Sequence, residues 1–151
     1  MYIYSINLRA ALFLGVYASG TKKSPGLTQA EVLKTKQHFI HGLKTGQTGI
    51  NSDLSGSCAV QHLPEDPSGY WTNAVRALVG GYDFQLSYNQ DGSVLVECID
   101  SCTHNNRNQW LKIFGIPVIH ETWLVCLNVW GAFETHWSFE LTSEEAAQLP
   151  L

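Results

Sequence analysis

The sequence predicts an α+β fold in which N-terminal helices pack on a small antiparallel β-sheet formed mainly by the C-terminal half. Apolar residues recur at three-to-four spacing in segments before residue 80, whereas apolar and polar residues alternate in segments after it. The 151 residues suffice for one compact domain but not for two ordinary ones, so we expect a single domain over residues 1–151. Apolar residues make up 44% of the chain and charged residues 15%, which is a globular composition.

The N-terminal segment is mostly apolar and ends before Gly20. One positive charge, a short apolar run and small residues after it resemble a weak signal peptide. The run is too short to span a bilayer. We favour a structural helix over residues 3–17, with a secretory leader as the alternative.

Two further helices are expected before residue 80. Thr28 and Glu31 form a capping box at the start of a helix that runs to about Leu43. A shorter helix covers residues 68–79, and Gly80 with the following glycine ends it. The side chains expected on their buried faces are Val32, Leu33, Phe39, Ile40 and Leu43, and then Trp71, Val75 and Leu78.

Strands dominate the prediction for the C-terminal half. Residues 82–88 and 93–99 alternate around a short turn and predict a β-hairpin. Residues 133–141 predict another strand, with Phe133, Trp137, Phe139 and Leu141 on one face and Glu134, His136, Ser138 and Glu140 on the other. Residues 120–130 favour a helix slightly over a strand. We expect a long loop over residues 45–67, which glycines and prolines punctuate, and at most a capped helical turn over residues 143–147.

Charge and cysteine content exclude some classes of partner and site. The net charge is −4, and no basic run extends beyond Lys22 and its neighbour, so a nucleic-acid ligand is disfavoured. The cysteines are Cys58, Cys98, Cys102 and Cys126. Their spacing does not match a zinc site. Two disulfides and free buried thiols both remain open.

A polar segment over residues 100–110 carries the main catalytic candidates. Asp100, His104 and Arg107 follow the hairpin within eight residues. A carboxylate binds Mg²⁺ or takes a proton, an imidazole shuttles protons near neutral pH, and a guanidinium holds phosphate charge. The trio suits phosphate-ester chemistry, with Asp100 as the metal ligand. An ordinary solvated polar loop is the alternative.

Three segments carry a resemblance to a known class of bacterial toxins. Residues 37–42 (QHFIHG), 77–82 (ALVGGY) and 96–100 (VECID), with the polar segment after them, resemble C-terminal modules of polymorphic toxins and secretion-system effectors. The stretch from Asp100 to Arg107 resembles the catalytic motif of colicin M-type bacteriocins. The sequence departs from that motif because Ser101, Cys102 and Thr103 stand where a Tyr-Asp pair is expected.

The resemblance implies an antibacterial effector that hydrolyses a cell-envelope substrate, namely the pyrophosphate of a lipid-linked peptidoglycan precursor. It further implies Mg²⁺ as cofactor, contact with a membrane-associated substrate, and an immunity protein as partner. Secretion, or delivery to the periplasm of target bacteria, would follow. His38 is a candidate substrate-binding neighbour of the catalytic residues.

Other residues suggest different classes of function. Cys58 follows small residues and is a candidate amidase nucleophile, with His136 as the best base and His120 as the second. His38 and His41 share a helix face, which suits metal binding, although structural histidines are more common there. A non-catalytic binding protein, such as an immunity protein, adaptor or inhibitor, is the rival to both enzymes. The side chains of Trp110, Trp123, Trp130 and Trp137 are expected to fill the core rather than form a surface.

Overall fold

The computed structural model describes residues 24–102, 110–113, 116–120 and 133–151. The chain divides into two compact units, one formed by residues 1–25 and 101–135, the other by residues 26–100 and 136–151. The helix expected over residues 3–17, most of the segment 120–130, and the indoles of Trp110, Trp123 and Trp130 lie outside the described part. The single-domain expectation stays a prediction.

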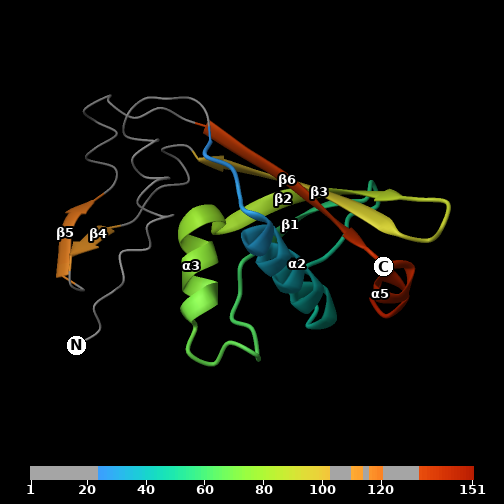
Figure 1. The fold of residues 1–151 in the computed structure, drawn as a ribbon, viewed down its shortest axis with the longest axis horizontal. Helices are drawn as coiled ribbons and strands as arrows, with labels where there is room; N and C mark the ends of the chain where they lie inside the picture. The colour runs from blue at the N-terminus through green and yellow to red at the C-terminus, as the bar shows by residue number, and fades with distance from the viewer. Residues whose placement is uncertain (1–23, 103–109, 114–115, 121–132) are drawn as a thin grey trace. The chain divides into compact units, whose positions relative to one another are not determined.

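The larger unit is built on a four-stranded antiparallel sheet with the order β1-β2-β3-β6. Its elements in chain order are α2 (Gln29–Lys44), β1 (Ser55–Ala59), α3 (Tyr70–Val79), β2 (Gly81–Tyr88), β3 (Val94–Cys102), β6 (Phe133–Leu141) and α5 (Ser143–Ala147). Helices α2 and α3 lie on the same side of the sheet (Figure 1). The predicted α+β class is therefore confirmed.

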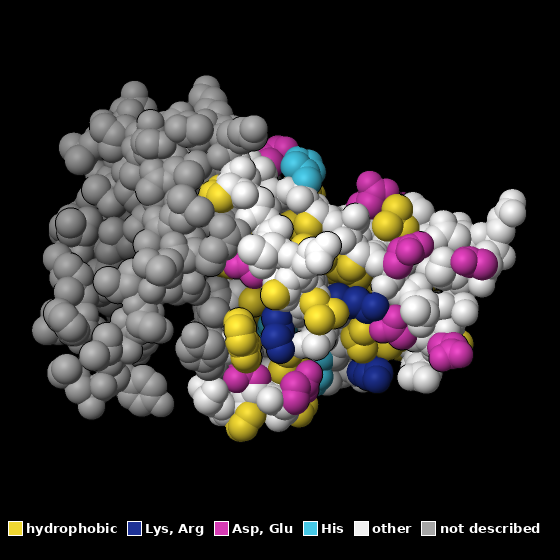
Figure 2. All heavy atoms as spheres, viewed as in Figure 1, with side chains coloured by type: hydrophobic (Ala, Val, Ile, Leu, Met, Phe, Trp, Pro, Cys, Tyr) yellow, Lys and Arg dark blue, Asp and Glu magenta, His cyan; other side chains and the backbone are white. Residues whose placement is uncertain are grey.

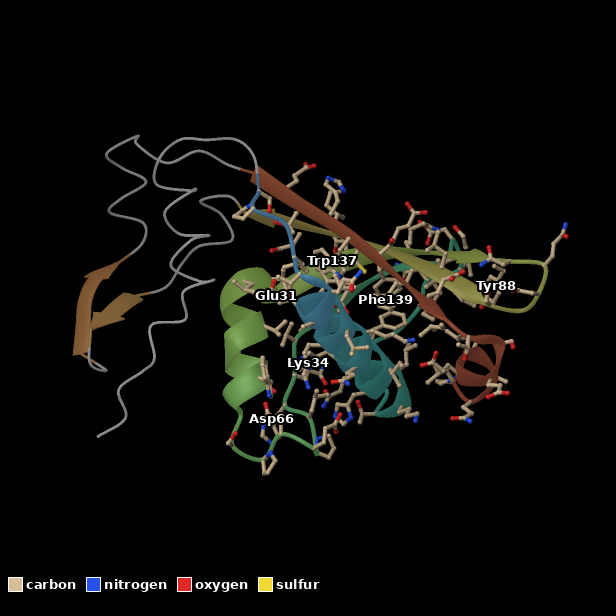
Figure 3. The ribbon with its side chains drawn as sticks, in the orientation of Figure 1. Glu31, Lys34, Asp66, Tyr88, Trp137 and Phe139 are labelled. Atoms are coloured by element: carbon tan, nitrogen blue, oxygen red, sulfur yellow. The ribbon has the colours of Figure 1, made fainter. Side chains whose placement is uncertain are left out.

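The core forms where α2 lies against the inner face of the sheet. Phe39 of α2 is fully buried, and its ring contacts Phe84 and Phe139 edge-on, with centroids 5.0 and 5.5 Å away. Such aromatic pairs add about 0.5–1.5 kcal/mol each beyond the area they bury. Trp137 and Phe139 both reach from β6 toward α2 (Figure 3). The predicted inward face of the last strand is confirmed for Trp137, Phe139 and Leu141.

A buried polar contact joins α2 to the strands. The Thr35 hydroxyl donates to the Val32 carbonyl at 2.6 Å and accepts the indole N–H of Trp137 at 3.0 Å. The Thr35 carbonyl accepts the Tyr82 hydroxyl at 3.3 Å. Each polar group thus finds a partner, as buried polar groups require.

The predicted capping box at the start of α2 is confirmed, and the C-terminal turn begins with a second one that was not predicted. Thr28 and Glu31 form a reciprocal capping box at α2, and Thr142 and Glu145 form another at α5. Glu145 also pairs with Lys36 of α2 at 2.9 Å. The second capping box therefore joins the C-terminal turn to the first described helix.

The expectation of a loop over residues 45–67 is wrong in part, because this segment contains strand β1. Ser55 to Ala59 pair antiparallel with Gln85 to Gly81 of β2. A Cβ at Gly56 would lie 2.5 Å from the Phe84 ring, so only glycine lets β1 approach there. Pairing and packing, rather than strand propensity, form this element.

Three other expectations need correction. Leu33 and Trp71, expected on buried faces, are 53% and 48% exposed. Strand β3 continues to Cys102, so the polar segment begins inside a strand and not after it. Strand β3 continues past its alternating apolar residues because the backbone hydrogen bonds that pair strands do not depend on side-chain polarity.

The smaller unit contains a second sheet of two strands that the sequence did not predict. Strand β4 (Trp110–Ile113) pairs antiparallel with β5 (Ile116–His120), with an irregularity between Leu111 and Lys112. In the same unit, the hydroxyls of Ser24 and Thr135 lie 2.6 Å apart. No helix in the described ranges of either unit is long and apolar enough to cross a membrane.

Candidate functional site

Of the three predicted catalytic residues, the structure describes only Asp100. It is half-buried in β3, two residues before the strand ends, and it interacts with neighbouring groups. His104 and Arg107 lie outside the described residues. The convergence of the three side chains on one cleft therefore stays a prediction, as does the Mg²⁺ site at Asp100.

Cys58 and His136 lie on opposite faces of the sheet. Cys58 is 2% exposed on the inner face, where its sulfur accepts the Thr48 hydroxyl at 3.4 Å. His136 is exposed on the outer face of β6. The sheet therefore separates this thiol from this imidazole. The side chain of His120, the second candidate base, is outside the described part.

The two described buried cysteines are thiols rather than disulfide partners. Cys58 and Cys98 flank β2 on its two sides, and neither is in a disulfide. Burial raises the pKa of the Cys98 thiol far above its ordinary range. Cys98 therefore stays protonated and is a poor nucleophile, since the thiolate is the reactive form.

His38 is fully buried in the middle of α2. Burial lowers its pKa below the ordinary value of 6.5. The Gln61 backbone opposes this shift to a lesser degree, but it lies outside hydrogen-bonding geometry, and neither ring nitrogen has a hydrogen bond. A neutral imidazole without partners is unusual in a protein interior.

One turn further along α2, His41 lines a pocket of about 540 Å³. We call it the α2–α3 pocket, because it opens between the end of α2, the loop after β1 and the start of α3. Its polar lining comprises His41, Gln47, Gln61, His62, Ser68, Thr72 and Arg76. No Asp or Glu is among the lining residues.

Asp66 lies at the base of α3 (Figure 3) and is bonded to Ser68 and Thr72, which line this pocket. Its carboxylate accepts the Thr72 backbone N–H at 2.9 Å, the Thr72 hydroxyl at 3.2 Å and the Ser68 hydroxyl at 3.1 Å. The backbone bond from Thr72 is the largest cause that holds the pKa of Asp66 below its ordinary range. Asp66 therefore caps α3 in place of Gly69, which has no side chain.

The outward sheet face is the second candidate surface. Within the larger unit, strand alternation places on this face Ser55, Ser57, Ala59, Gly81, Asp83, Gln85, Ser87, Leu95, Glu97, Ile99, His136, Ser138 and Glu140. Leu95 and Ile99 are half-buried, while Asp83, Glu97 and Glu140 are exposed. Glu97 lies between Leu95 and Ile99 on this face of β3, and Asp83 is opposite Ile99 on β2, so apolar and acidic side chains alternate there.

Charge is segregated in the larger unit. Residues 26–100 and 136–151 contain eleven Asp and Glu but four Lys and Arg, which gives a formal net charge of −7. The four cations are Lys34, Lys36 and Lys44 on α2 and Arg76 on α3. In Figure 2 the Lys and Arg side chains lie over the helices. The outward sheet face carries three carboxylates and no Lys or Arg.

The described residues contain no group of three or more His, Cys, Asp or Glu side chains close enough to hold a metal ion. His38 and His41, adjacent on α2, thus lack a third ligand of these types among the described residues. Sequence reasoning missed Gln61, His62 and Arg76. They lie in different segments, and no local motif joins them.

Comparison of the chain with protein-family models, with curated proteins and with solved structures gives no match. The resemblance to toxin modules is neither supported nor opposed by this result.

Proposed function

We propose that the chain is a non-catalytic protein-binding module that binds a basic partner protein through the outward sheet face. The observation that carries this proposal is the charge segregation, which leaves that face acidic and free of Lys and Arg. An adaptor, an inhibitor or an immunity protein would each work in this way.

The composition of the face supports a specific contact rather than a diffuse attraction. Leu95 and Ile99 supply apolar area on β3, with Glu97 between them and Asp83 opposite Ile99 on β2. Protein interfaces combine apolar contacts with hydrogen bonds and charged groups in this way. Acidic side chains on the rim attract a basic partner and raise its association rate.

The geometry of the flanking residues favours a preformed surface. The Asp83 carboxylate accepts the Ser57 hydroxyl at 2.6 Å, and Glu140 accepts the Asn89 side-chain amide at 3.1 Å. Side chains held by such bonds lose less conformational entropy on binding. The face therefore holds the charges of Asp83 and Glu140 in fixed positions.

A matched pair of charge variants tests the proposal. Asp83→Asn with Glu97→Gln removes two charges from the outward face, whereas Glu65→Gln with Glu144→Gln removes two exposed charges elsewhere. With a lysine-rich peptide that includes aromatic residues as probe, we expect the first pair to weaken binding about tenfold and the second less than twofold. Hydrogen exchange should show protection in β2 and β3 on binding.

Equal weakening by both pairs would show that net charge alone attracts the peptide, and the proposed face would then be wrong. Protection confined to α2 and α3 would refute it as well.

The hydrolytic effector stays a separate prediction. Asp100→Ala combined with His104→Ala is expected to abolish toxicity on periplasmic expression if those residues are catalytic. A binding module would keep its peptide affinity in the same variant. Periplasmic expression that harms no cell would count against the effector.

A further inference from the structure

The lining of the α2–α3 pocket contains a cationic side chain, Arg76, and two imidazoles in a unit that is otherwise strongly acidic. Arg76, His41 and His62 come from three segments, α3, α2 and the loop after β1, and all line the same space. The nearest acid, Asp66, already accepts three hydrogen bonds from Thr72 and Ser68. The pocket lining therefore favours an anion, although the unit as a whole does not.

The wall of the pocket also holds a polar atom without a partner. Gln61 lines the pocket, yet its side-chain oxygen Oε1 is shielded from solvent and accepts no hydrogen bond. Behind it, the fully buried His38 leaves both ring nitrogens unpaired. Buried groups of this kind normally have a protein, water or ligand partner. An O–H donor on a bound ligand would satisfy Oε1 once the Gln61 side chain turns toward the pocket.

These two observations narrow the chemistry of the ligand. Arg76 favours negatively charged oxygens, because a guanidinium binds them in a fixed fork, and the imidazoles of His41 and His62 can donate further hydrogen bonds. Gln61 Oε1 requires a donor on the same ligand. Hydrogen phosphate and phosphate monoesters with a neighbouring hydroxyl have both, whereas sulfate has the charge without the O–H.

We propose that the α2–α3 pocket binds a small phosphate compound, either inorganic phosphate or a phosphate monoester, through Arg76, His41 and His62. The volume of about 540 Å³ exceeds what inorganic phosphate fills and lies in the range of small-molecule sites. This site is independent of the outward sheet face.

Calorimetric titration of the full chain tests the proposal, with inorganic phosphate, glycerol phosphate and sulfate as probes at fixed ionic strength. We expect saturable binding of at least one phosphate compound, about tenfold tighter than sulfate. Tighter binding of glycerol phosphate would assign the site to monoesters, and tighter binding of inorganic phosphate to the free ion.

Charge variants distinguish binding in the α2–α3 pocket from a general attraction of the anion to positive charge. Arg76→Gln should weaken phosphate binding about tenfold, while Lys44→Gln, the same charge change on α2 outside the lining, should change it less than twofold. Arg76→Lys keeps the positive charge and should bind with intermediate affinity. Its binding shows whether the weak binding of Arg76→Gln comes from the lost guanidinium or from a folding defect. Gln61→Leu should remove the preference for phosphate over sulfate.

The proposal is overturned if neither phosphate compound gives saturable binding. It is overturned equally if Lys44→Gln weakens binding as much as Arg76→Gln. Equal affinity of the unaltered chain for sulfate and phosphate would refute the role of Gln61 as acceptor.

Discussion

The Thr35 hydroxyl is a single group on which the pairing of α2 with β6 depends. Thr35→Val keeps the shape of the side chain but leaves the buried indole N–H of Trp137 without an acceptor, so we expect a loss of about 1–3 kcal/mol in the free energy of unfolding. Thr35→Ser keeps the hydroxyl and removes one methyl, which costs about 0.8 kcal/mol. Urea denaturation measures both.

A double-mutant cycle isolates that hydrogen bond. In a Trp137→Phe background the indole N–H is absent, so Thr35→Val should cost much less than in the unaltered chain. An unchanged cost would mean that the contact with Trp137 does not account for the effect.

His38 is expected to make stability depend on pH. Because burial lowers its pKa in the folded state, the unfolded chain binds more protons once the pH falls through the ordinary value of 6.5. The free energy of unfolding should therefore fall on acidification, at up to about 1.4 kcal/mol per pH unit. Above that range the group is neutral in both states and contributes no pH dependence.

His38→Leu removes the titrating group and serves as the comparison. Its stability should decline less than that of the unaltered chain between pH 7 and pH 5.5, as measured by thermal unfolding. The difference between the two proteins at pH 8 reports the change in packing alone. Parallel pH profiles would show that His38 does not titrate on unfolding in this range.

Close approach of the end of α2 to the following loop depends on Gly42. A Cβ at this position would collide with the side chain of Thr48, which is itself 4% exposed and bonded to Cys58. Gly42→Ala should therefore destabilise the chain by about 1–3 kcal/mol, because overpacking displaces buried neighbours. Gly49→Ala meets no atom within 4 Å and should change stability by less than about 0.5 kcal/mol. Chemical denaturation compares the two, and equal effects would contradict the collision.

The elements that the sequence predicts best are those in which local signals and tertiary packing agree. Thr28 and Glu31 define the start of α2 by local chemistry, and the alternation from Tyr82 to Tyr88 defines β2 by its buried face. Strand β1 lacks both kinds of signal. Its small side chains fit only because β2 and the Phe84 ring lie against them.

The residues of the candidate site were harder to predict because they, too, lack a local signal in the sequence. Gln61, His62 and Arg76 share a pocket through the path of the chain, not through spacing in sequence. The sequence analysis named His38 as a candidate, but the helical pattern did not indicate its complete burial. Asp100 belongs to a strand because pairing extends past the apolar alternation.

At the scale of the whole molecule, the larger unit is formed by two stretches of chain separated by residues 101–135. Strands β3 and β6 are neighbours in an antiparallel sheet, so the end of one lies near the start of the other. Replacement of residues 103–132 by a short glycine-containing turn should leave the unit folded, with one cooperative unfolding transition and a buried Trp137. Loss of that transition would show that the sheet requires the replaced segment.

The contact between Thr35 and Trp137 joins residues 102 positions apart, and this separation has a consequence for biosynthesis. At about 5–20 residues per second, a ribosome needs roughly 5–20 s to make the intervening chain. During that time the apolar face of α2 has no β6 to cover it. The nascent chain therefore depends on chaperones, or on rapid later pairing, to avoid aggregation before its last strand is made.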